Sequence, residues 1–203
     1  MTYLAIDTTN SILNVVLRKD ENLYHFEKKM EKTEHSSSLM PAINSIIDEA
    51  DVDIKDIDYF AVNVGPGSFT GIRIGVASMT ALSFANSAKR VAYKTFELIA
   101  LKRAKCVVSV DAGHGNIYIA NCENGEIVDT SFIEAAQNYD LSQTVSDPLI
   151  ETYLAIDEVV MKKITNNDLV NVFEPFYMRK FRNKHIFCPR RSKSLLFHFN
   201  HLV

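Results

Sequence analysis

Glycines and polar residues are concentrated in one stretch of the chain whose pattern could hold an anion. Residues 64–75 read Val-Gly-Pro-Gly-Ser-Phe-Thr-Gly-Ile-Arg-Ile-Gly and follow an apolar run at 59–64. The pattern predicts a strand, a tight turn and the start of a helix. Because the first N–H groups of a helix lack partners and carry the positive end of its dipole, such a turn favours a phosphate or a carboxylate. The residues that could contact this anion are Gly65, Gly67, Ser68, Thr70, Gly71 and Arg73.

Two known phosphate-binding loops do not fit this stretch. A Walker loop needs a lysine and then a serine or threonine after its last glycine, whereas Ile-Arg follows Gly71. A dinucleotide fingerprint has closer glycine spacing and an acidic residue about 20 positions further on, where this chain has Lys89 and Arg90. Spacing alone therefore favours a structural turn that permits close packing over a ligand site.

An aspartate ends each of two similar apolar runs. Asp7 closes residues 3–7, and Asp111 closes residues 107–111 at an offset of 104. At the same offset a second apolar run, 117–120, aligns with 13–16. A polar turn at 123–126 likewise aligns with the turn at 19–22. A repeat of this kind indicates two similar α/β lobes that face each other across a cleft. Both aspartates, with Gly113 of the Asp-x-Gly pattern, are expected to point into that cleft.

Hydrophobic periodicity predicts the elements that hold these residues. Strands are expected at 3–7, 12–18, 23–29, 59–64 and 91–93, and helices at 36–50, 71–88, 96–104, 134–139 and 148–164. No second glycine turn follows the repeated strands, so the second lobe is expected to be shorter. The predicted division is a first lobe at 1–105 and a second lobe at 106–203.

The helix predicted at 71–88 is apolar or small around its whole circumference, and Arg73 is its only charge before Ala88. A helix that is apolar on every side must be covered on every side. One face can pack on the sheet, and the other needs the helix at 36–50 or a second protein; a fully internal helix is the competing interpretation. The candidate contact residues are Leu39, Met40, Ile43, Ile47, Gly71, Ile74, Gly75, Ser78, Ala81, Leu82 and Ala85.

The charge is unevenly distributed along the chain. The net charge is −3, yet seven Lys and Arg residues and no acidic residue follow Glu174, which leaves −10 for the first 174 residues. An acidic body is a poor platform for nucleic acid, whereas a basic tail could touch a phosphate backbone. A solvated terminal arm is the simpler interpretation of this tail.

Composition also limits location and metal chemistry. No run of 18 apolar residues is present, and the N-terminus lacks the features of a signal peptide, so we expect no membrane span and a cytoplasmic protein. Cys106, Cys122 and Cys188 are widely spaced without a C-x-x-C pair, which argues against a zinc site and fits a reducing compartment.

Four motifs together resemble the TsaB (YeaZ) family. They are Ala5-Ile6-Asp7-Thr8-Thr9, His35-Ser36 with Leu39-Met40-Pro41, the glycine stretch at 65–75, and Glu174-Pro175-x-Tyr177. The resemblance covers most of residues 1–180, and the glycine stretch is its most specific part. It implies the actin-like, sugar-kinase-like ATPase fold of the ribonuclease H type (the ASKHA fold), in agreement with the internal repeat.

The resemblance also implies a function in tRNA modification. TsaB-type proteins are non-catalytic partners of the enzyme TsaD, which with the ATPase TsaE installs threonylcarbamoyl on the adenosine beside the anticodon. They pair with TsaD, or with a second copy of themselves, through the helices that correspond to 36–50 and 71–88 here. The expected partners are therefore TsaD, TsaE in a larger complex, a second copy when the chain is alone, and tRNA indirectly or through the basic tail.

Comparison with TsaD argues against independent catalysis. The metal-binding H-x-x-x-H of TsaD falls here on Thr95 and Ile99, which cannot supply imidazole ligands, so no metal is expected. Asp7-Thr8-Thr9 lacks the phosphate-loop glycine of actin-like ATPases, so no nucleotide is expected to bind tightly; weak ATP or ADP contact at a partner boundary is the remaining expectation.

Two other functions are considered. The main alternative is a stand-alone actin-like ATPase or small-molecule kinase. A peptidase that uses His35 with Ser36, Ser37 or Ser38 ranks last, because neighbours in sequence rarely form a catalytic triad.

Overall fold

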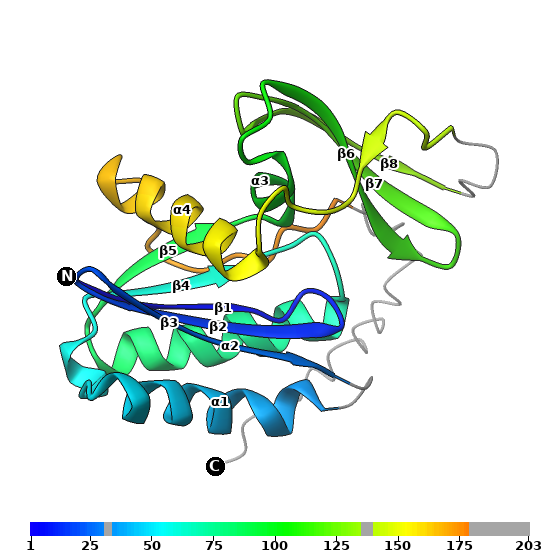
Figure 1. The fold of residues 1–203 in the computed structure, drawn as a ribbon. Helices are drawn as coiled ribbons and strands as arrows, with labels where there is room; N and C mark the ends of the chain where they lie inside the picture. Colours follow the sequence, from blue (N-terminus) through cyan, green and yellow to red (C-terminus); the bar gives the residue numbers. More distant parts are fainter. Residues whose placement is uncertain (31–33, 135–139, 179–203) are drawn as a thin grey trace, which may run out of the picture.

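The structure is a computed structural model that describes residues 1–30, 34–134 and 140–178, and these form two lobes (Figure 1). The larger lobe is built on a five-stranded sheet of order β3-β2-β1-β4-β5. Its strands are β1 (Thr2–Asp7), β2 (Ile12–Lys19), β3 (Asn22–Lys29), β4 (Tyr59–Asn63) and β5 (Lys89–Tyr93). The first three strands form an antiparallel meander, and β4 and β5 run parallel to β1.

Strand β1 lies at the centre of this sheet and is buried on both faces. Its apolar residues run without interruption from Tyr3 to Ile6, as expected for a strand covered on both sides. Leu4 and Ile6 point into one core, whereas Tyr3 and Ala5 point into the other. The sheet therefore divides the larger lobe into two apolar layers.

Helices cover both faces of the sheet. On one face lie α1 (His35–Ala50) and α2 (Phe69–Ala85), and on the other lies α4 (Thr152–Thr165) (Figure 1). A 3-10 turn, η1 (Ile54–Asp56), leads into β4, and α3 (Thr95–Ala100) connects β5 to the smaller lobe. No helix in the described part of the chain is long and apolar enough to cross a membrane.

The smaller lobe repeats the beginning of the larger one. Its four-stranded sheet has the order β8-β7-β6-β9, with an antiparallel meander of three strands and β9 parallel to β6, as β4 is to β1. Its strands are β6 (Lys105–Gly113), β7 (Asn116–Glu123), β8 (Glu126–Ile133) and β9 (Thr144–Val145). The predicted duplication with a shortened second copy is confirmed. The registers differ by one residue, since Asp7 lies opposite Asn14 whereas Asp111 lies opposite Ile117.

The predicted elements have counterparts within a few residues of their expected bounds. The largest differences are four residues: α3 ends at Ala100 instead of continuing to residue 104, and α4 begins at Thr152 instead of residue 148. The short helix expected at 134–139 falls outside the described residues from 135 onward. The division at residue 105 stays a prediction, because α4 follows it in sequence yet packs against the sheet of the first lobe.

A partly buried ion pair fixes α4 to that sheet. Arg18 on β2 donates from Nε to Asp157 Oδ1 at 2.7 Å and from Nη2 to Asp157 Oδ2 at 2.5 Å. The Tyr3 hydroxyl also donates to Asp157 Oδ1. Burial and the contact with Asp157 raise the pKa of Tyr3 far above its usual range, so this hydroxyl stays protonated. A bidentate pair with a third donor gives α4 one defined position on the sheet.

We predict that Asp157→Asn lowers the free energy of unfolding by about 2–3 kcal/mol, because it leaves the Arg18 charge under α4 without its counter-charge. Urea unfolding followed by circular dichroism measures this loss. The matched control is Glu158→Gln, on the same helix as Asp157. It breaks the exposed ion pair between Glu158 and Lys102 and should lower the free energy of unfolding by less than about 0.5 kcal/mol. Equal effects of the two substitutions would contradict the assigned role of Asp157.

Candidate functional site

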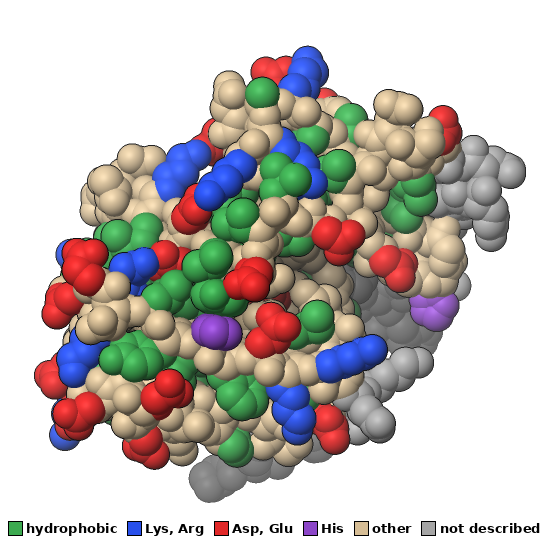
Figure 2. Space-filling model, in the orientation of Figure 1, with side chains coloured by type: hydrophobic (Ala, Val, Ile, Leu, Met, Phe, Trp, Pro, Cys, Tyr) green, Lys and Arg blue, Asp and Glu red, His purple; other side chains and the backbone are tan. Residues whose placement is uncertain are grey.

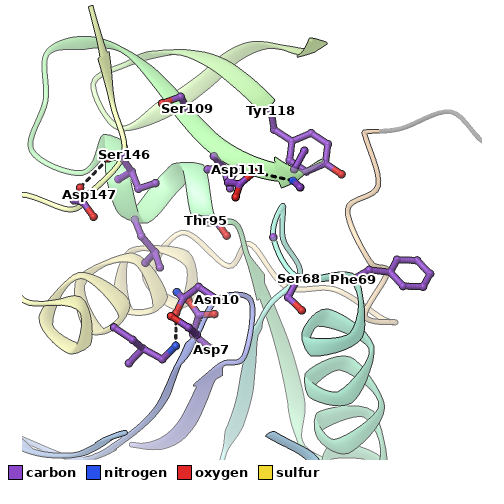
Figure 3. Close-up of a pocket in the computed structure, with 18 of the residues that line it drawn as sticks. Asp7, Asn10, Ser68, Phe69, Thr95, Ser109, Asp111, Tyr118, Ser146 and Asp147 are labelled. Carbon is purple, nitrogen blue, oxygen red and sulfur yellow. Dashed lines mark hydrogen bonds between the residues drawn. The ribbon is translucent and has the colours of Figure 1, made fainter. Parts of the chain in front are cut away.

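A cleft of about 1370 Å³ separates the two lobes and brings together residues from both (Figure 3). From the larger lobe it is lined by Asp7 at the end of β1 and Ser68 at the start of α2. From the smaller lobe it is lined by Asp111 and Gly113 on β6. Sequence reasoning expected both aspartates at such a cleft, and the structure puts them on its opposite walls.

A buried polar network surrounds Asp7. Its Oδ1 accepts hydrogen bonds from the backbone N–H of Thr9 at 2.8 Å and from the Thr9 hydroxyl at 2.7 Å. Its Oδ2 accepts from Asn63 Nδ2 at 2.8 Å, and Asn63 also donates to Thr95 Oγ1 at 3.1 Å. The Thr95 hydroxyl lies 2.7 Å from the carbonyl oxygen of Pro66, to which it can donate. The network therefore ties together the ends of β1 and β4, the glycine turn and the start of α3.

Burial raises the pKa of Asp7 above its ordinary value. Hydrogen bonds from Thr9 and Asn63, and the nearby imidazole of His35, act in the opposite direction and favour the ionised form. His35 also lines the cleft, and its Nε2 atom is buried without a hydrogen-bond partner among the described residues. The cleft is thus lined by a buried acid whose charge is costly to keep away from water.

The glycines of the turn permit close backbone contact with the end of β1. A Cβ on Gly67 would lie 2.4 Å from the Thr9 carbonyl oxygen, and one on Gly71 would lie 1.9 Å from the Thr8 carbonyl oxygen. Ser68 N donates to the Thr9 carbonyl at 2.6 Å, and the Ser68 hydroxyl accepts from Gly71 N at the start of α2. These contacts support the interpretation of the stretch as a turn that allows close packing.

The predicted anion contacts are only partly brought together. Asp7, Gly67, Ser68, Asp111 and Gly113 line the cleft, whereas Gly65, Thr70, Gly71 and Arg73 do not. The described lining holds four carboxylates, those of Asp7, Asp111, Glu134 and Asp147, and no lysine or arginine. The Gly113 N–H, which a phosphate would need, already donates to Asp111 Oδ1 at 2.7 Å. This electrostatic environment disfavours a free phosphate.

Four of the eleven predicted partner contacts belong to the chain's own core. Leu39 and Ile43 on α1 are 1% and 0% exposed, so their side chains cannot reach another protein, and that expectation is wrong. Gly71 and Gly75 face inward against Thr8, where there is no room for a side chain. Ile47, Ile74, Ser78 and Leu82 are half-buried, and the exposed members of the predicted set are Met40, Ala81 and Ala85.

The outer face of α2 is apolar although it is exposed. Phe84 is 78% exposed and lies near Ala81 and Ala85, with Ala77 one turn before Ala81. These residues recur at helical spacing and point away from the buried Met79 and Ser83 of the same helix. The prediction that α2 carries more apolar surface than its own fold covers agrees with this exposure, as far as the described residues show.

Sequence reasoning missed an aromatic cluster at the start of α2. The Arg73 guanidinium lies 3.8 Å from the centre of the Phe69 ring, and its Nε donates to the Tyr177 hydroxyl at 3.2 Å. Phe69 and Tyr177 are 46% and 40% exposed and line the edge of the cleft. No local sequence signal could have indicated this contact, which depends on the return of the chain after α4, where Phe176 N donates to the Val64 carbonyl beside the glycine turn.

The two positions that correspond to the TsaD histidines line the cleft and have structural roles here. Thr95 belongs to the Asp7 network, and Ile99 is buried beneath the smaller sheet. Among the described residues, no group of three or more His, Cys, Asp and Glu side chains could hold a metal ion. Asn63, the other missed member of the network, could have been noticed as a single polar residue within an apolar run.

Two lobes that repeat one strand order and face a common cleft define the actin-like ATPase, or ribonuclease H-like, fold. The solved structure of YeaZ from Pseudomonas aeruginosa has the same fold, with a TM-score of 0.69 and 19% identity over 83% of this chain and 94% of that one. A family model described as TsaD, tRNA N6-adenosine threonylcarbamoyltransferase, matches residues 29–182.

Two curated relatives of the chain share one name. Proteins named tRNA threonylcarbamoyladenosine biosynthesis protein TsaB are 31% identical over 121 residues in Buchnera aphidicola (strain Sg) and 34% over 100 residues in Bacillus subtilis. These matches cover 57% and 49% of this chain, and 57% and 44% of the relatives. The chain thus spans about half the length of the curated relatives it matches. It belongs to the TsaD family, and these curated relatives are TsaB proteins.

We predict that Asp7 makes stability depend on pH with a definite sign. Because its pKa is raised from 3.8 in the folded chain, the folded state keeps a proton that the unfolded state loses first. The contribution of Asp7 is therefore complete below pH 3.8 and is lost as the pH rises through the folded pKa. The difference in unfolding free energy, wild type minus Asp7→Asn, should fall across this window in urea titrations.

The matched control for this experiment is Asp140→Asn. Hydrogen bonds from Ser142 lower the pKa of the exposed Asp140 below 3.8. Its contribution is therefore present above pH 3.8 and is lost as the pH falls through the folded pKa. The difference in unfolding free energy, wild type minus Asp140→Asn, should therefore fall as the pH decreases below 3.8. Parallel pH profiles for wild type and Asp7→Asn would refute the assignment for Asp7.

Proposed function

We propose that the chain is a non-catalytic subunit of the system that makes threonylcarbamoyladenosine in tRNA, and that it pairs with TsaD. The curated TsaB relatives are named for this biosynthesis, and the matching family model is named for the transferase. The single structural observation that carries the proposal is the exposed apolar face of α2.

The composition of that face suits a helix from another protein. Ala77, Ala81 and Ala85 are small and lie on one side of α2, so a partner helix could approach closely. Phe84 and the half-exposed Met40 on α1 add larger apolar surface at the edges. A stripe of this kind is costly to leave in water, and burial stabilises it by about 25 cal/mol per Å² of apolar surface.

An accessory role is supported by the residues at the positions of the enzyme's histidines. Thr95 and Ile99 both line the cleft, but a hydroxyl is a poor metal ligand and an isoleucine side chain is none. The transferase chemistry would then belong to TsaD, and this chain would act by binding and positioning it. TsaE would join the larger complex, and a second copy would occupy α2 when TsaD is absent.

Contact with tRNA is assigned to the partner. Figure 2 shows acidic and basic side chains interspersed on the face it presents, without the continuous basic surface that a phosphate backbone favours. The first 174 residues carry a charge of −10, which would repel tRNA. Direct contact through the basic residues after Glu174 remains a secondary part of this proposal, as does weak ATP or ADP binding at the partner boundary.

The proposal predicts that Ala81→Arg weakens binding to TsaD at least about 100-fold, because a charged side chain would be buried in the centre of an apolar interface. Isothermal titration calorimetry or gel filtration with purified TsaD measures this loss, and circular dichroism verifies that the variant is folded. The matched control is Val128→Arg, at another exposed apolar residue on β8, which should leave binding unchanged. A folded Ala81→Arg variant that binds TsaD normally would overturn the proposal.

The alternative, a stand-alone ATPase or kinase, is favoured by the two aspartates that face each other across the cleft. The acidic lining and the occupied Gly113 N–H argue against it. We therefore expect purified chain with ATP and magnesium to show no steady phosphate release above a buffer blank. Turnover that is sustained without partners and abolished by Asp111→Asn would favour the alternative.

A further inference from the structure

Two of the three cysteines, far apart in sequence, are direct neighbours in the smaller sheet. Cys106 on β6 and Cys122 on β7 are opposite each other in the antiparallel register. Both are free thiols. Residues opposite each other on antiparallel strands point to the same face, with Cα atoms about 4.5–5.5 Å apart. A disulfide needs Cα atoms about 4.4–6.8 Å apart, so the pair can be bridged with little backbone movement.

The environment of the pair distinguishes the two thiols. Cys122 is buried against Phe96 and Ile99 in the smaller core, and Cys106 is half-exposed at its edge. Each thiol is close enough to affect the pKa of the other. Only Cys106 is therefore accessible to a dissolved oxidant, and Cys122 is held where it can resolve a mixed disulfide.

Burial makes both thiols weak acids. It raises the pKa of Cys106, although Arg103 acts in the opposite direction, and it raises the pKa of Cys122 to about 12 with help from Cys106, Glu97 and Asp129. The thiolate is the reactive form, so both steps are expected to be slow near neutral pH and faster at alkaline pH. The pair should therefore respond to sustained oxidation instead of brief exposure to air.

We propose that Cys106 and Cys122 form a reversible intramolecular disulfide when the chain meets a low-molecular-weight disulfide such as oxidised glutathione. The Cys106 thiolate attacks one sulfur of the oxidant, breaks its S–S bond and releases one glutathione thiolate. Cys122 then loses its proton, and its sulfur attacks the Cys106 sulfur of the mixed disulfide and releases the second glutathione. Two protein thiols are oxidised, and one oxidant molecule is reduced to two thiols.

The consequence is a covalent link between β6 and β7 beneath α3. Because α3 connects the two lobes and its first residue, Thr95, belongs to the Asp7 network, the link lies beneath the connection between the lobes. A cross-link that closes a loop of this length restricts the unfolded chain. Oxidation should thus make the smaller lobe harder to unfold, without any requirement for a partner.

The test uses Cys188→Ser, which removes the third cysteine from the chain. After incubation with oxidised glutathione, we expect the count of free thiols to fall from two to none and the protein mass to fall by two hydrogen atoms. Peptide mapping should recover Cys106 linked to Cys122, the melting temperature should rise by on the order of 5 °C, and dithiothreitol should reverse each change. In the matched control, Cys122→Ala with Cys188→Ser, glutathione should remain on Cys106.

Two results would overturn the proposal. One is a Cys188→Ser protein that retains glutathione on Cys106 while the Cys122 thiol stays free after prolonged incubation. The other is a disulfide formed only between separate chains in dilute protein. If the Cys122→Ala control does not fold, the mass and peptide map of the Cys188→Ser protein decide the matter without it.

Discussion

The contact between the glycine turn and the end of β1 determines much of the architecture around the cleft. Gly67 and Gly71 allow the turn to meet the backbone of Thr8 and Thr9 at distances that exclude any side chain. The parallel pairing of β1 with β4 places Asp7 beside Asn63, and the glycine contact fixes the rotation of α2 about its own axis. Since Gly71 and Gly75 must face inward, the residues on the opposite side of the helix must face outward.

That rotation connects packing to function. A helix that is apolar all round has no preferred face in isolation, so only the inward glycines decide which apolar residues remain exposed. The exposed set includes Ala81 and Ala85, whereas Gly75 belongs to the core. A second constraint acts on the other face of the sheet, where the pair of Arg18 and Asp157 brings α4 back to the first lobe. The two halves of the chain are therefore mechanically joined, although the sequence repeat suggests separate units.

Some features of the site follow from sequence because they depend on local chemistry. The turn at 64–75 could be interpreted as a close-packing turn from its glycines, and the two aspartates could be assigned to a cleft from the internal repeat. The contact face on α1 and α2 could not be derived in the same way, since Leu39 and Ile43 satisfy the same helical spacing as exposed residues. The meeting of Arg73 with Tyr177 depends on the path of the chain after α4, which no local pattern encodes.

The sequence by itself determined the fold class, the order of the strands and helices, the shortened second copy and the resemblance to the TsaB family. These properties rest on periodicity, turn residues and repetition, which are local or nearly local signals. Only the tertiary structure decided which face of α2 is exposed, which aspartate is buried and which cysteines are neighbours. The physical reason is that rotation of a helix and register of a strand are set by distant contacts, such as Gly71 against Thr8 and Cys106 opposite Cys122.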